Sequence, residues 1–492
     1  MMLNDRTNTV HFSWNSRIMR SLIPALIVVT LLSLAGAKLS AANKPNIIFI
    51  LADDLGYGEV GAYGQEKILT PSLDKMAAGG MRFTHHFAGG AVCGPSRACL
   101  MTGQSQAIGF VKGNPGGQPA RENLRDQDVT VAEILKSAGY ATACIGKWGL
   151  GPQGESGYPL NQGFDYFLGY DTHVAAHNYY PASLCENKDQ RQLSGNSGDK
   201  KRVGKVYTHD VFTEQALEFI GEKREQPYFL YLAYAIPHSP YNPPDIEPYQ
   251  DKDWSTTNKK YAAMITRMDR DIGRVLDLVK KSEKDTLVIF TSDNGPQSGG
   301  STESQITRFF DSNGEQKGIK RDMYNGGIRV PFIAWWPGKI EADSVSKHIS
   351  SFQDFLPTVC EITESQIEVT TDGLSYLPTL LGKYGVQAEH EWLYWEFLYM
   401  SKKGIAGRQA VLNPKLGFKA VRFGRNAPVE LYRFEEDIAE TNDVAKQFPE
   451  IANQMSSYLD SCRSESKLWP ISYHDKPHAS TFSPHYKKGD RN

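Results

Sequence analysis

The sequence predicts an α/β fold: an α/β/α sandwich with a large, mostly parallel sheet, plus a smaller C-terminal α+β domain with a short antiparallel sheet. The first observation behind this prediction is a set of uninterrupted apolar runs bounded by turn residues, at 46–52, 228–235 and 285–292. Such runs are typical of strands buried on both faces, as in parallel sheets. The second is a set of helix-like segments between them, at 130–138, 211–222 and 261–281. Strands that alternate with helices predict a layered α/β architecture.

The first 42 residues have the pattern of a secretory signal peptide. Arg17 and Arg20 precede an apolar run over 22–35, and small residues follow as far as Ala42. A basic start, a short apolar run and a small-residue exit are typical of such peptides. The run is shorter than the roughly 20 apolar residues of a membrane-spanning helix, so we expect an exported protein, periplasmic or secreted, without a stable membrane anchor. An uncleaved N-terminal anchor is the alternative.

Three further segments follow this N-terminal stretch. We expect the catalytic domain at 43–385 and the smaller domain at 386–466, because the pattern changes there to short strands and one helix. The expected strands are 391–400, 409–411, 418–423 and 431–434, and the expected helix is 444–459. Residues 467–492 are polar and lack periodicity, so we expect an irregular tail.

Charge and cysteine content argue against several classes of protein. The 54 Lys and Arg residues nearly balance the 56 Asp and Glu residues, for a formal net charge of −2. A dedicated nucleic-acid binder would usually carry a strongly basic face, so we expect no nucleic-acid partner. Six cysteines in 492 residues, with no Cys-x-x-Cys pair, argue against a disulfide scaffold and a thiolate zinc site. The pairing of these cysteines does not follow from the sequence.

Each of the three strand-like runs ends in polar residues. Asp53 and Asp54 follow the first run, His238 follows the second, and Asp293 and Asn294 follow the third. Because ligands bind at the carboxyl ends of strands in open parallel sheets, we expect these side chains to meet. The carboxylate and amide oxygens suit Ca²⁺, with Mg²⁺ as the alternative. Taken singly, an Asp pair is better explained by a helix cap or a solvated loop, and Asp-Asn-Gly by a turn.

The segment Cys93-Gly-Pro-Ser-Arg97 is the most informative in the chain. If a helix begins near Pro95, Cys93 lies at its N-terminus, where backbone N–H groups and the helix dipole favour an anion. Arg97 lies one turn further on and can add a bidentate clamp. The alternative is a half-buried cysteine in a turn, disulfide-bonded to Cys99.

Cys93-Gly-Pro-Ser-Arg97, followed by Leu100-Met-Thr-Gly103, resembles the signature of the type I, formylglycine-dependent sulfatases, which belong to the alkaline phosphatase superfamily and include the arylsulfatases. Other segments resemble further blocks of that family in the same order, so the similarity covers nearly all of the chain after residue 42. These segments are 46–58, 70–74, 146–148, 237–240, 292–296, 320–331 and 430–432. The resemblance implies an alkaline phosphatase-like fold and a sulfuric ester hydrolase.

The resemblance also implies a mechanism. In this family a formylglycine-generating maturation enzyme oxidises the motif cysteine, here Cys93, to formylglycine, which hydrates to a geminal diol. One hydroxyl attacks sulfur and the other later expels sulfate, so that hydrolysis becomes two easier steps. One Ca²⁺ would acidify the nucleophilic hydroxyl and absorb developing charge. The implied metal-site residues are Asp53, Asp54, Cys93, Asp293 and Asn294.

The remaining site residues follow from the same resemblance. Arg97, Lys147 and Lys320 would neutralise the sulfate oxygens, and His238 would protonate the sugar oxygen as the S–O bond breaks. The implied substrate-binding residues are Lys147, His177, His238 and Lys320. Solvent-exposed cations, and a histidine that caps a proline-rich turn, are the alternatives.

Two positions depart from the family pattern. The family commonly has Gly-Lys-Trp-His-Leu-Gly, with a histidine associated with collapse of the sulfated diol, and this chain has Gly149 at that position. His173 or His177 could reach the site from a loop, and we favour His177 as the catalytic replacement. Asn325 stands where the family has Glu, and we expect a structural role for this residue.

The substrate expected from the resemblance is a sulfated carbohydrate, with a galactose- or N-acetylgalactosamine-type sugar. Two alternatives stay open. One is a phosphatase or phosphonate hydrolase of the same superfamily, although such enzymes often have a two-zinc site with several His ligands. The other is a catalytically silent carbohydrate-binding relative. This alternative stays open because Gly149 replaces the catalytic histidine of the family.

Overall fold

The structure, a computed structural model, describes residues 44–114, 123–198, 203–297, 306–366, 369–401, 404–425, 427–471 and 473–474. The predicted signal peptide and most of the predicted tail lie outside these residues. Pro45–Asn492 form one unit, to which all of the following applies. Among the described residues, no helix combines the length and the apolar character that crossing a membrane requires.

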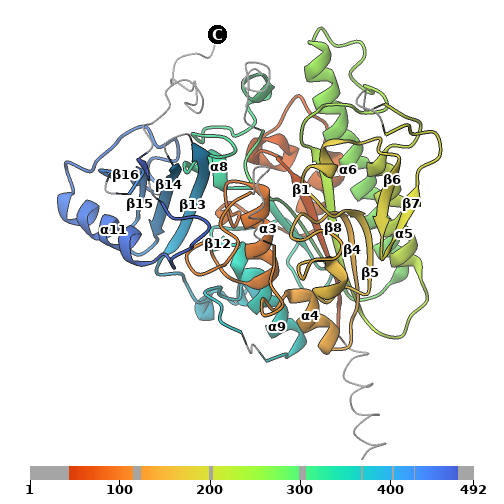
Figure 1. The fold of residues 1–492 in the computed structure, drawn as a ribbon, viewed down its shortest axis with the longest axis horizontal. Coiled ribbons are helices and arrows are strands. Elements are labelled where there is room, and N and C mark those ends of the chain that lie inside the picture. The colour runs from red at the N-terminus through yellow and green to blue at the C-terminus, as the bar shows by residue number, and fades with distance from the viewer. Residues whose placement is uncertain are drawn as a thin grey trace, which may run out of the picture. The chain divides into compact units, whose positions relative to one another are not determined.

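The described residues form a central sheet of ten strands in the order β11-β2-β10-β9-β1-β8-β4-β5-β6-β7 (Figure 1). These strands are β1 (Asn46–Asp53), β2 (Met81–Phe83), β4 (Ala141–Lys147), β5 (Tyr166–Tyr170), β6 (Ser183–Glu186), β7 (Asp189–Gln192), β8 (Tyr228–Pro237), β9 (Thr286–Ser292), β10 (Phe332–Trp335) and β11 (Ser344–Ser346). The centre, from β9 to β5, is parallel, and Ile47 of β1 pairs with Phe229 on one side and Leu287 on the other. Strands β10 and β6 run antiparallel to their neighbours, and β11 pairs parallel with β2, so the sheet is mixed with a parallel majority, in agreement with the prediction.

Helices cover both faces of this sheet, as predicted. Ile48 and Ile50 of β1 point into a core shared with α2 (Pro71–Ala78), α5 (Thr208–Gly221) and α6 (Thr256–Ser282). Ile47 and Phe49 point into a second core, shared with α3 (Cys93–Thr102), α4 (Val131–Ser137), α9 (Phe355–Thr363) and α10 (Leu377–Leu380). An unbroken apolar run is therefore needed here, because successive side chains of a strand enter opposite cores.

Several shorter elements connect these layers. The two-residue strands β3 (His86–Phe87) and β12 (Ser350–Ser351) pair with each other, and α8 (Asn325–Ile328) precedes β10. The 3₁₀ helices are η1 (Tyr57–Glu59), η2 (Gly61–Tyr63), η3 (Pro159–Asn161), η4 (Ala175–His177), η5 (Phe352–Asp354) and η6 (Tyr384–Val386).

A second, antiparallel sheet follows along the chain. Its strands are β13 (Leu393–Ser401), β14 (Gly404–Asn413), β15 (Phe418–Phe423) and β16 (Glu430–Arg433), and β17 (Tyr473–His474) pairs parallel with β14. One face packs against α11 (Pro449–Ser461). The opposite face, which includes Trp395, packs against Val92, Met323 and Ile328, residues next to the polar cluster described below. The second sheet therefore supports that cluster from one side.

Helix boundaries differ most from the predictions at α11 and α6. Helix α11 starts at Pro449 rather than at residue 444, because proline suits the first turn of a helix and disfavours helical backbone at the residue before it. Helix α6 begins five residues earlier than predicted, at Thr256, where the Ser255 hydroxyl accepts a hydrogen bond from the backbone N–H of Asn258. All six cysteines lie in the described residues, and none forms a disulfide there.

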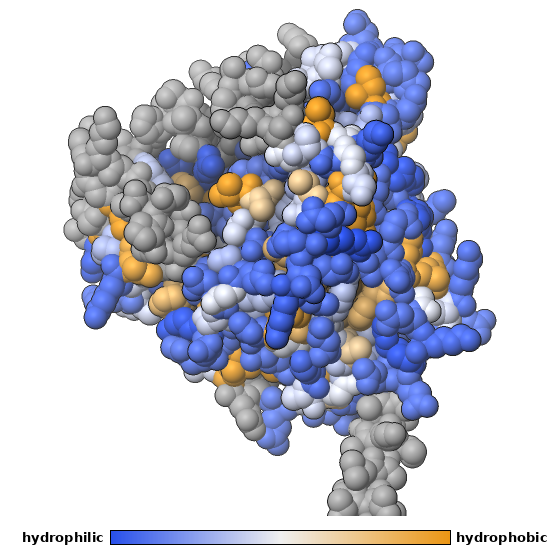
Figure 2. Space-filling model, turned by 45° about the vertical axis from the view of Figure 1, so that its right-hand side comes forward, coloured by the Kyte–Doolittle hydropathy of each residue, from blue (hydrophilic) through white to orange (hydrophobic). Residues whose placement is uncertain are grey.

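The surface of the described residues is predominantly hydrophilic on the face in Figure 2, where apolar side chains are scattered in small groups. The large apolar side chains with high exposure come from distant parts of the chain, among them Leu69, Val174 and Val386. This face therefore presents small apolar groups rather than one continuous apolar surface.

Candidate active site

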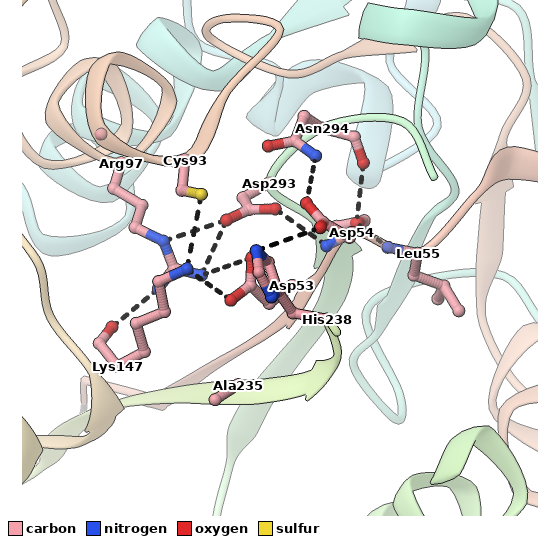
Figure 3. Close-up of polar contacts among 12 residues, drawn as sticks. Asp53, Asp54, Leu55, Cys93, Arg97, Lys147, Ala235, His238, Asp293 and Asn294 are labelled. Carbon is pink, nitrogen blue, oxygen red and sulfur yellow. Dashed lines mark hydrogen bonds and ion pairs between the residues drawn. The ribbon is translucent and has the colours of Figure 1, made fainter. Parts of the chain in front are cut away.

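The carboxyl ends of β1, β8 and β9 bring Asp53, Asp54, His238, Asp293 and Asn294 together, as the strand-end pattern predicts (Figure 3). The backbone N–H of Asp54 donates to Oδ1 of Asp293 at 3.2 Å, and Nδ2 of Asn294 donates to Oδ1 of Asp54 at 2.7 Å. Asp54 has a φ of +68°, a left-handed conformation that Asp tolerates better than most residues. All five side chains are buried.

Helix α3 presents Cys93 to this cluster. The helix begins at Cys93 itself, two residues before Pro95, and ends at Gly103 in a left-handed cap. The backbone N–H of Gly94 donates to Oδ1 of Asn114 at 2.8 Å. In Figure 3 the Cys93 sulfur points toward the carboxylates. The residue therefore lies at a helix N-terminus, where backbone N–H groups favour negative charge.

Two ammonium groups approach the Cys93 sulfur. Nζ of Lys147 lies 3.4 Å from Sγ, and Nζ of Lys320 lies 3.7 Å from it. Burial raises the pKa of the thiol, and these two cations only partly oppose the rise. The two ammonium groups thus favour an anionic atom at position 93, but burial outweighs them for sulfur, and the thiol stays protonated near neutral pH.

Each of the three buried cations is paired with a carboxylate. Nε and Nη2 of Arg97 donate to Oδ2 of Asp293 at 3.0 and 2.7 Å, and Nη1 donates to the Lys147 carbonyl at 2.7 Å. Nζ of Lys147 is 2.5 Å from Oδ2 of Asp53. Nζ of Lys320 lies 2.6 and 2.8 Å from the two carboxylate oxygens of Asp54. The three side chains that the resemblance singled out are thus brought to one point.

The pairs also set the ionisation of the acids. Burial alone would raise the pKa of Asp53, but the charges of Lys147 and Arg97 hold it well below the ordinary value. For Asp54, burial again raises the pKa and the charge of Lys320 lowers it, and the net result is a lowered pKa. Both residues are therefore carboxylates at neutral pH.

The acids fit a divalent cation. Oxygens of Asp53 and Asp293 and the sulfur of Cys93 lie within 4.8 Å of one another, as do ligand atoms of Asp53, Asp54 and His238. Oδ1 of Asp53 and Oδ1 of Asn294 are buried and accept no hydrogen bond from the described residues. Buried acceptors without a donor are costly, and a hard cation that prefers oxygen ligands would satisfy both.

His238 borders the acids, next to His177. Its Nε2 lies 3.5 Å from Oδ2 of Asp54, and its Nδ1 is 2.6 Å from the carbonyl oxygen of Ser239. Burial lowers the pKa of His238 to about 4, despite the nearby carboxylate of Asp54. The ring of His177 stacks on that of His238, with centroids 4.6 Å apart and planes 15° apart. His177 therefore contacts the site through His238.

Other residues at the site were not predicted. Asn114, which binds the first turn of α3, stands between Gly113 and Pro115 in the sequence, without a distinctive spacing. The Tyr179 hydroxyl donates to the carbonyl oxygens of Ala235 and His238 and so fixes the chain after β8. Neither side chain belongs to a pattern that would separate it from ordinary loop residues. Asn325, expected to be structural, accepts a 2.9 Å hydrogen bond from Lys419 of the second sheet.

Comparison with known proteins identifies the family. The family model described as sulfatase matches residues 45–365, which is more than half of the chain. The chain belongs to the sulfatase family. A second model, for the C-terminal part of N-sulphoglucosamine sulphohydrolase, matches residues 315–465. As a sulfatase, the protein is a sulfuric ester hydrolase, which decides against the phosphatase and phosphonate hydrolase alternative.

Relatives of this sulfatase include the N-acetylgalactosamine-6-sulfatase of Canis lupus familiaris, 32% identical over 72% of this chain and 69% of that protein. Arylsulfatase G of Rattus norvegicus is 30% identical over 83% of this chain and 84% of that protein. Among solved structures, Ps i-CgsB aligns with a TM-score of 0.73 at 26% identity, covering 87% of this chain and 95% of the other. Ps i-CgsB has also been solved in complex with k-i-k-neocarrahexaose.

Proposed function

We propose that this sulfatase removes sulfate from a sulfated carbohydrate, with a galactose- or N-acetylgalactosamine-type sugar at the cleaved ester. The names of the relatives support the sugar class, since they include N-acetylgalactosamine-6-sulfatases and an oligosaccharide complex. The observation that carries the chemistry is the placement of Cys93 at the start of α3, with two lysine ammonium groups within 3.7 Å of its sulfur.

The nucleophile that we propose is a matured form of Cys93. A formylglycine-generating enzyme would convert the thiol to an aldehyde, whose hydrate offers a hydroxyl in place of sulfur. Lys147 and Lys320 would stabilise the anionic form of that hydroxyl, because they already lie beside the atom that it replaces. The helix N-terminus would add to this stabilisation.

The metal that we propose is one Ca²⁺, with Mg²⁺ as the alternative. Asp53, Asp54, Asp293 and Asn294 would hold it together with residue 93, and all four side chains are oxygen ligands suited to a hard cation. When bound, the ion would lower the pKa of a coordinated hydroxyl and polarise a sulfate oxygen.

Arg97, Lys147 and Lys320 would bind the sulfate group. Their three positive charges at least offset the negative charges of Asp53, Asp54 and Asp293, the last of which has its pKa raised to about 7 by burial and the charge of Asp53. A divalent cation would therefore give the buried site an excess of positive charge. An anionic sulfate ester and an anionic nucleophile would restore the balance, which favours a charged substrate over a neutral one.

His238 would act as the general acid on the sugar oxygen, with His177 as a substrate-pocket residue beside it. The hydrogen bond from Nδ1 to the Ser239 carbonyl leaves Nε2 directed at the acids. An anionic ester near the ring would favour its protonated form and raise its pKa from about 4. The stacked ring of His177 would hold His238 in this orientation.

The domain and export assignments are part of the same proposal. The catalytic domain would cover 43–385 and the smaller domain 386–466, after a signal peptide at 1–42 and before a tail at 467–492. Export to the periplasm or the medium would bring the enzyme to sulfated polysaccharides outside the cell.

Mass spectrometry of the peptide that contains Cys93 tests the nucleophile. In active protein we expect that peptide to have lost mass, because an aldehyde oxygen replaces the sulfur and two hydrogens of the cysteine side chain. A panel of sulfated galactose, N-acetylgalactosamine and glucosamine compounds then tests the substrate class. Cys93→Ala should abolish sulfate release, whereas the matched control Cys185→Ser, outside the site, should not. Active protein whose Cys93 is fully an unmodified thiol would exclude the proposal.

A further inference from the structure

His173 lies in the loop between β5 and η4, with its ring against Gly149. A Cβ atom placed on Gly149 would lie 2.4 Å from Cε1 of this ring and 2.7 Å from Nδ1. Both distances are shorter than any real Cβ contact, so the ring of His173 fills the space that a side chain at position 149 would take. Gly149 also has a φ of +79°, which glycine adopts without strain.

The other side of the ring faces the first turn of α3. A Cβ atom placed on Gly94 would lie 3.2 Å from Nε2 of His173 and 2.4 Å from Oδ1 of Asn114. Asn114 in turn places its Nδ2 4.0 Å from the Cys93 sulfur. Two glycines, Gly94 and Gly149, thus leave room for one imidazole beside residue 93.

Both ring nitrogens of His173 are buried, and neither has a hydrogen-bond partner among the described residues. Burying a polar nitrogen without a hydrogen-bond partner is unfavourable, so a side chain that only filled space at this position would be expected to be apolar. Burial, together with the charges of Lys147 and Arg97, holds the pKa of His173 well below its ordinary value. The ring is therefore a neutral imidazole with a free lone pair, against the first turn of the helix that begins at residue 93.

We propose that His173 is a catalytic residue that accepts a proton from the group at position 93 when sulfate leaves the enzyme. This inference rests on the proposed function. In the step, a ring nitrogen of His173 takes the proton of the free hydroxyl on the residue-93 carbon, and the electrons of that O–H bond form the C=O bond. The bond between this carbon and the sulfate-bearing oxygen breaks, and sulfate leaves with both electrons. The imidazolium then returns the proton to water.

The two loop histidines therefore have separate partners. His177 stacks on His238, which faces Asp54, whereas His173 contacts Gly149 and the start of α3. This arrangement assigns the proton acceptor at residue 93 to His173 rather than to His177.

The first test uses His173→Ala and the similarly sized His173→Gln, which cannot take up the proton. On a substrate that the wild type hydrolyses, we expect kcat to fall by about 100-fold or more in both variants. Quenched reactions should contain a residue-93 peptide heavier by one SO₃ group, because the second step is slowed. Circular dichroism verifies folding. The matched control is Val174→Ala, at the neighbouring, largely exposed residue, which should keep wild-type turnover.

The second test exchanges the two positions. Gly149→His alone should be poorly active, since its side chain would overlap the His173 ring. The pair Gly149→His with His173→Ala should regain part of the activity that His173→Ala loses, because one imidazole again occupies the shared space; the positive φ at position 149, which disfavours any side chain, limits the recovery. Turnover of His173→Ala within threefold of wild type, slow turnover without the SO₃ adduct, or full activity of Gly149→His alone would each overturn the assignment. A wild type that hydrolyses no sulfate ester would instead refute the proposed function.

Discussion

At the scale of single residues, the site is a set of buried charges that stabilise one another. Lys320 is 3% exposed, and its ammonium group contacts both carboxylate oxygens of Asp54. Each member is expensive to bury alone and is stabilised by its partner. Removing one therefore leaves an uncompensated charge as well as a missing contact to the substrate.

Lys320→Ala should lower kcat/KM for a sulfated substrate by about 100- to 1,000-fold, the range for loss of one buried charge-stabilising group. The loss should appear at every pH at which the wild type is active, because the ammonium group stays protonated. Steady-state kinetics measure this decrease in kcat/KM, with Lys339→Ala, a variant of an exposed lysine, as the control. A decrease of less than fivefold would place Lys320 outside the reaction.

Glu59 gives the fold a pH dependence. Burial raises its pKa to about 7, although its carboxyl group accepts hydrogen bonds from Ser312, Tyr261 and the Gly56 N–H. An acid whose folded-state pKa is raised favours folding while it is protonated, and this contribution is lost as the pH rises through the folded-state value.

The free energy of unfolding of the wild type should therefore fall relative to that of Glu59→Gln between about pH 4.5 and pH 7. The total change follows from the pKa shift and is roughly 3 kcal/mol. Urea denaturation of both proteins at several pH values provides the measurement. Parallel pH profiles would show that Glu59 titrates normally.

At the scale of elements, the apolar pattern of the sequence predicts the long strands that are buried on both faces. The central strands at 46–52, 228–235 and 285–292 appear close to where the sequence places them, because each faces a helix layer on both sides. The flanking strands β2 and β7 have three and four residues, and β7 is largely exposed, so no apolar period marks them. The antiparallel pairings at the two sides of the sheet therefore could not be predicted from the sequence.

Among the site residues, local sequence patterns likewise predict some and miss others. The strand-end rule predicts Asp53 and Asp293 as neighbours, and the helix start at Cys93 follows from the turn residues around it. Lys147 and Lys320 required the family resemblance, because nothing in their local sequence separates them from surface lysines. The choice between His173 and His177 depends on the path of a loop, which no local pattern encodes.

A side chain of helix α6 caps the N-terminus of helix α2, on the same face of the central sheet. Asp269 of α6 accepts hydrogen bonds from the backbone N–H groups of Ser72 and Leu73, in the first turn of α2, at 3.0 and 2.8 Å. It thus replaces the N-cap side-chain hydrogen bond that α2 lacks.

Asp269→Ala should lower the free energy of unfolding by about 1 to 2 kcal/mol, the range for loss of a helix cap. Asp269→Asn should retain part of the stabilisation by this cap, because the amide oxygen still accepts a hydrogen bond. Thermal and urea denaturation provide the comparison with Asp277→Ala, an exposed aspartate on the same helix. Equal stability of the Asp269 and Asp277 variants would contradict the cap.

At the scale of the unit Pro45–Asn492, the second sheet supports the site. The Trp395 indole N–H donates to the Ala88 carbonyl, five residues before Cys93, at 2.8 Å. Lys419 of β15 pairs with Glu440 at 2.7 Å, and Glu440 also accepts from the backbone N–H of Asn325 at 2.6 Å. The segments that carry Cys93 and Lys320 are therefore both attached to this sheet.

Lys419→Met should consequently affect stability and activity together. The change leaves Glu440 buried without its cation, which costs about 3 to 5 kcal/mol for pairs of this kind. The double variant Lys419→Met with Glu440→Gln should recover much of the stability, since the amide oxygen can still accept from Asn325. Activity should return with it, because Lys320 regains its position. Differential scanning calorimetry and sulfate release measured on the same samples test this coupling. Full activity in a strongly destabilised Lys419→Met protein would show that the second sheet does not position Lys320.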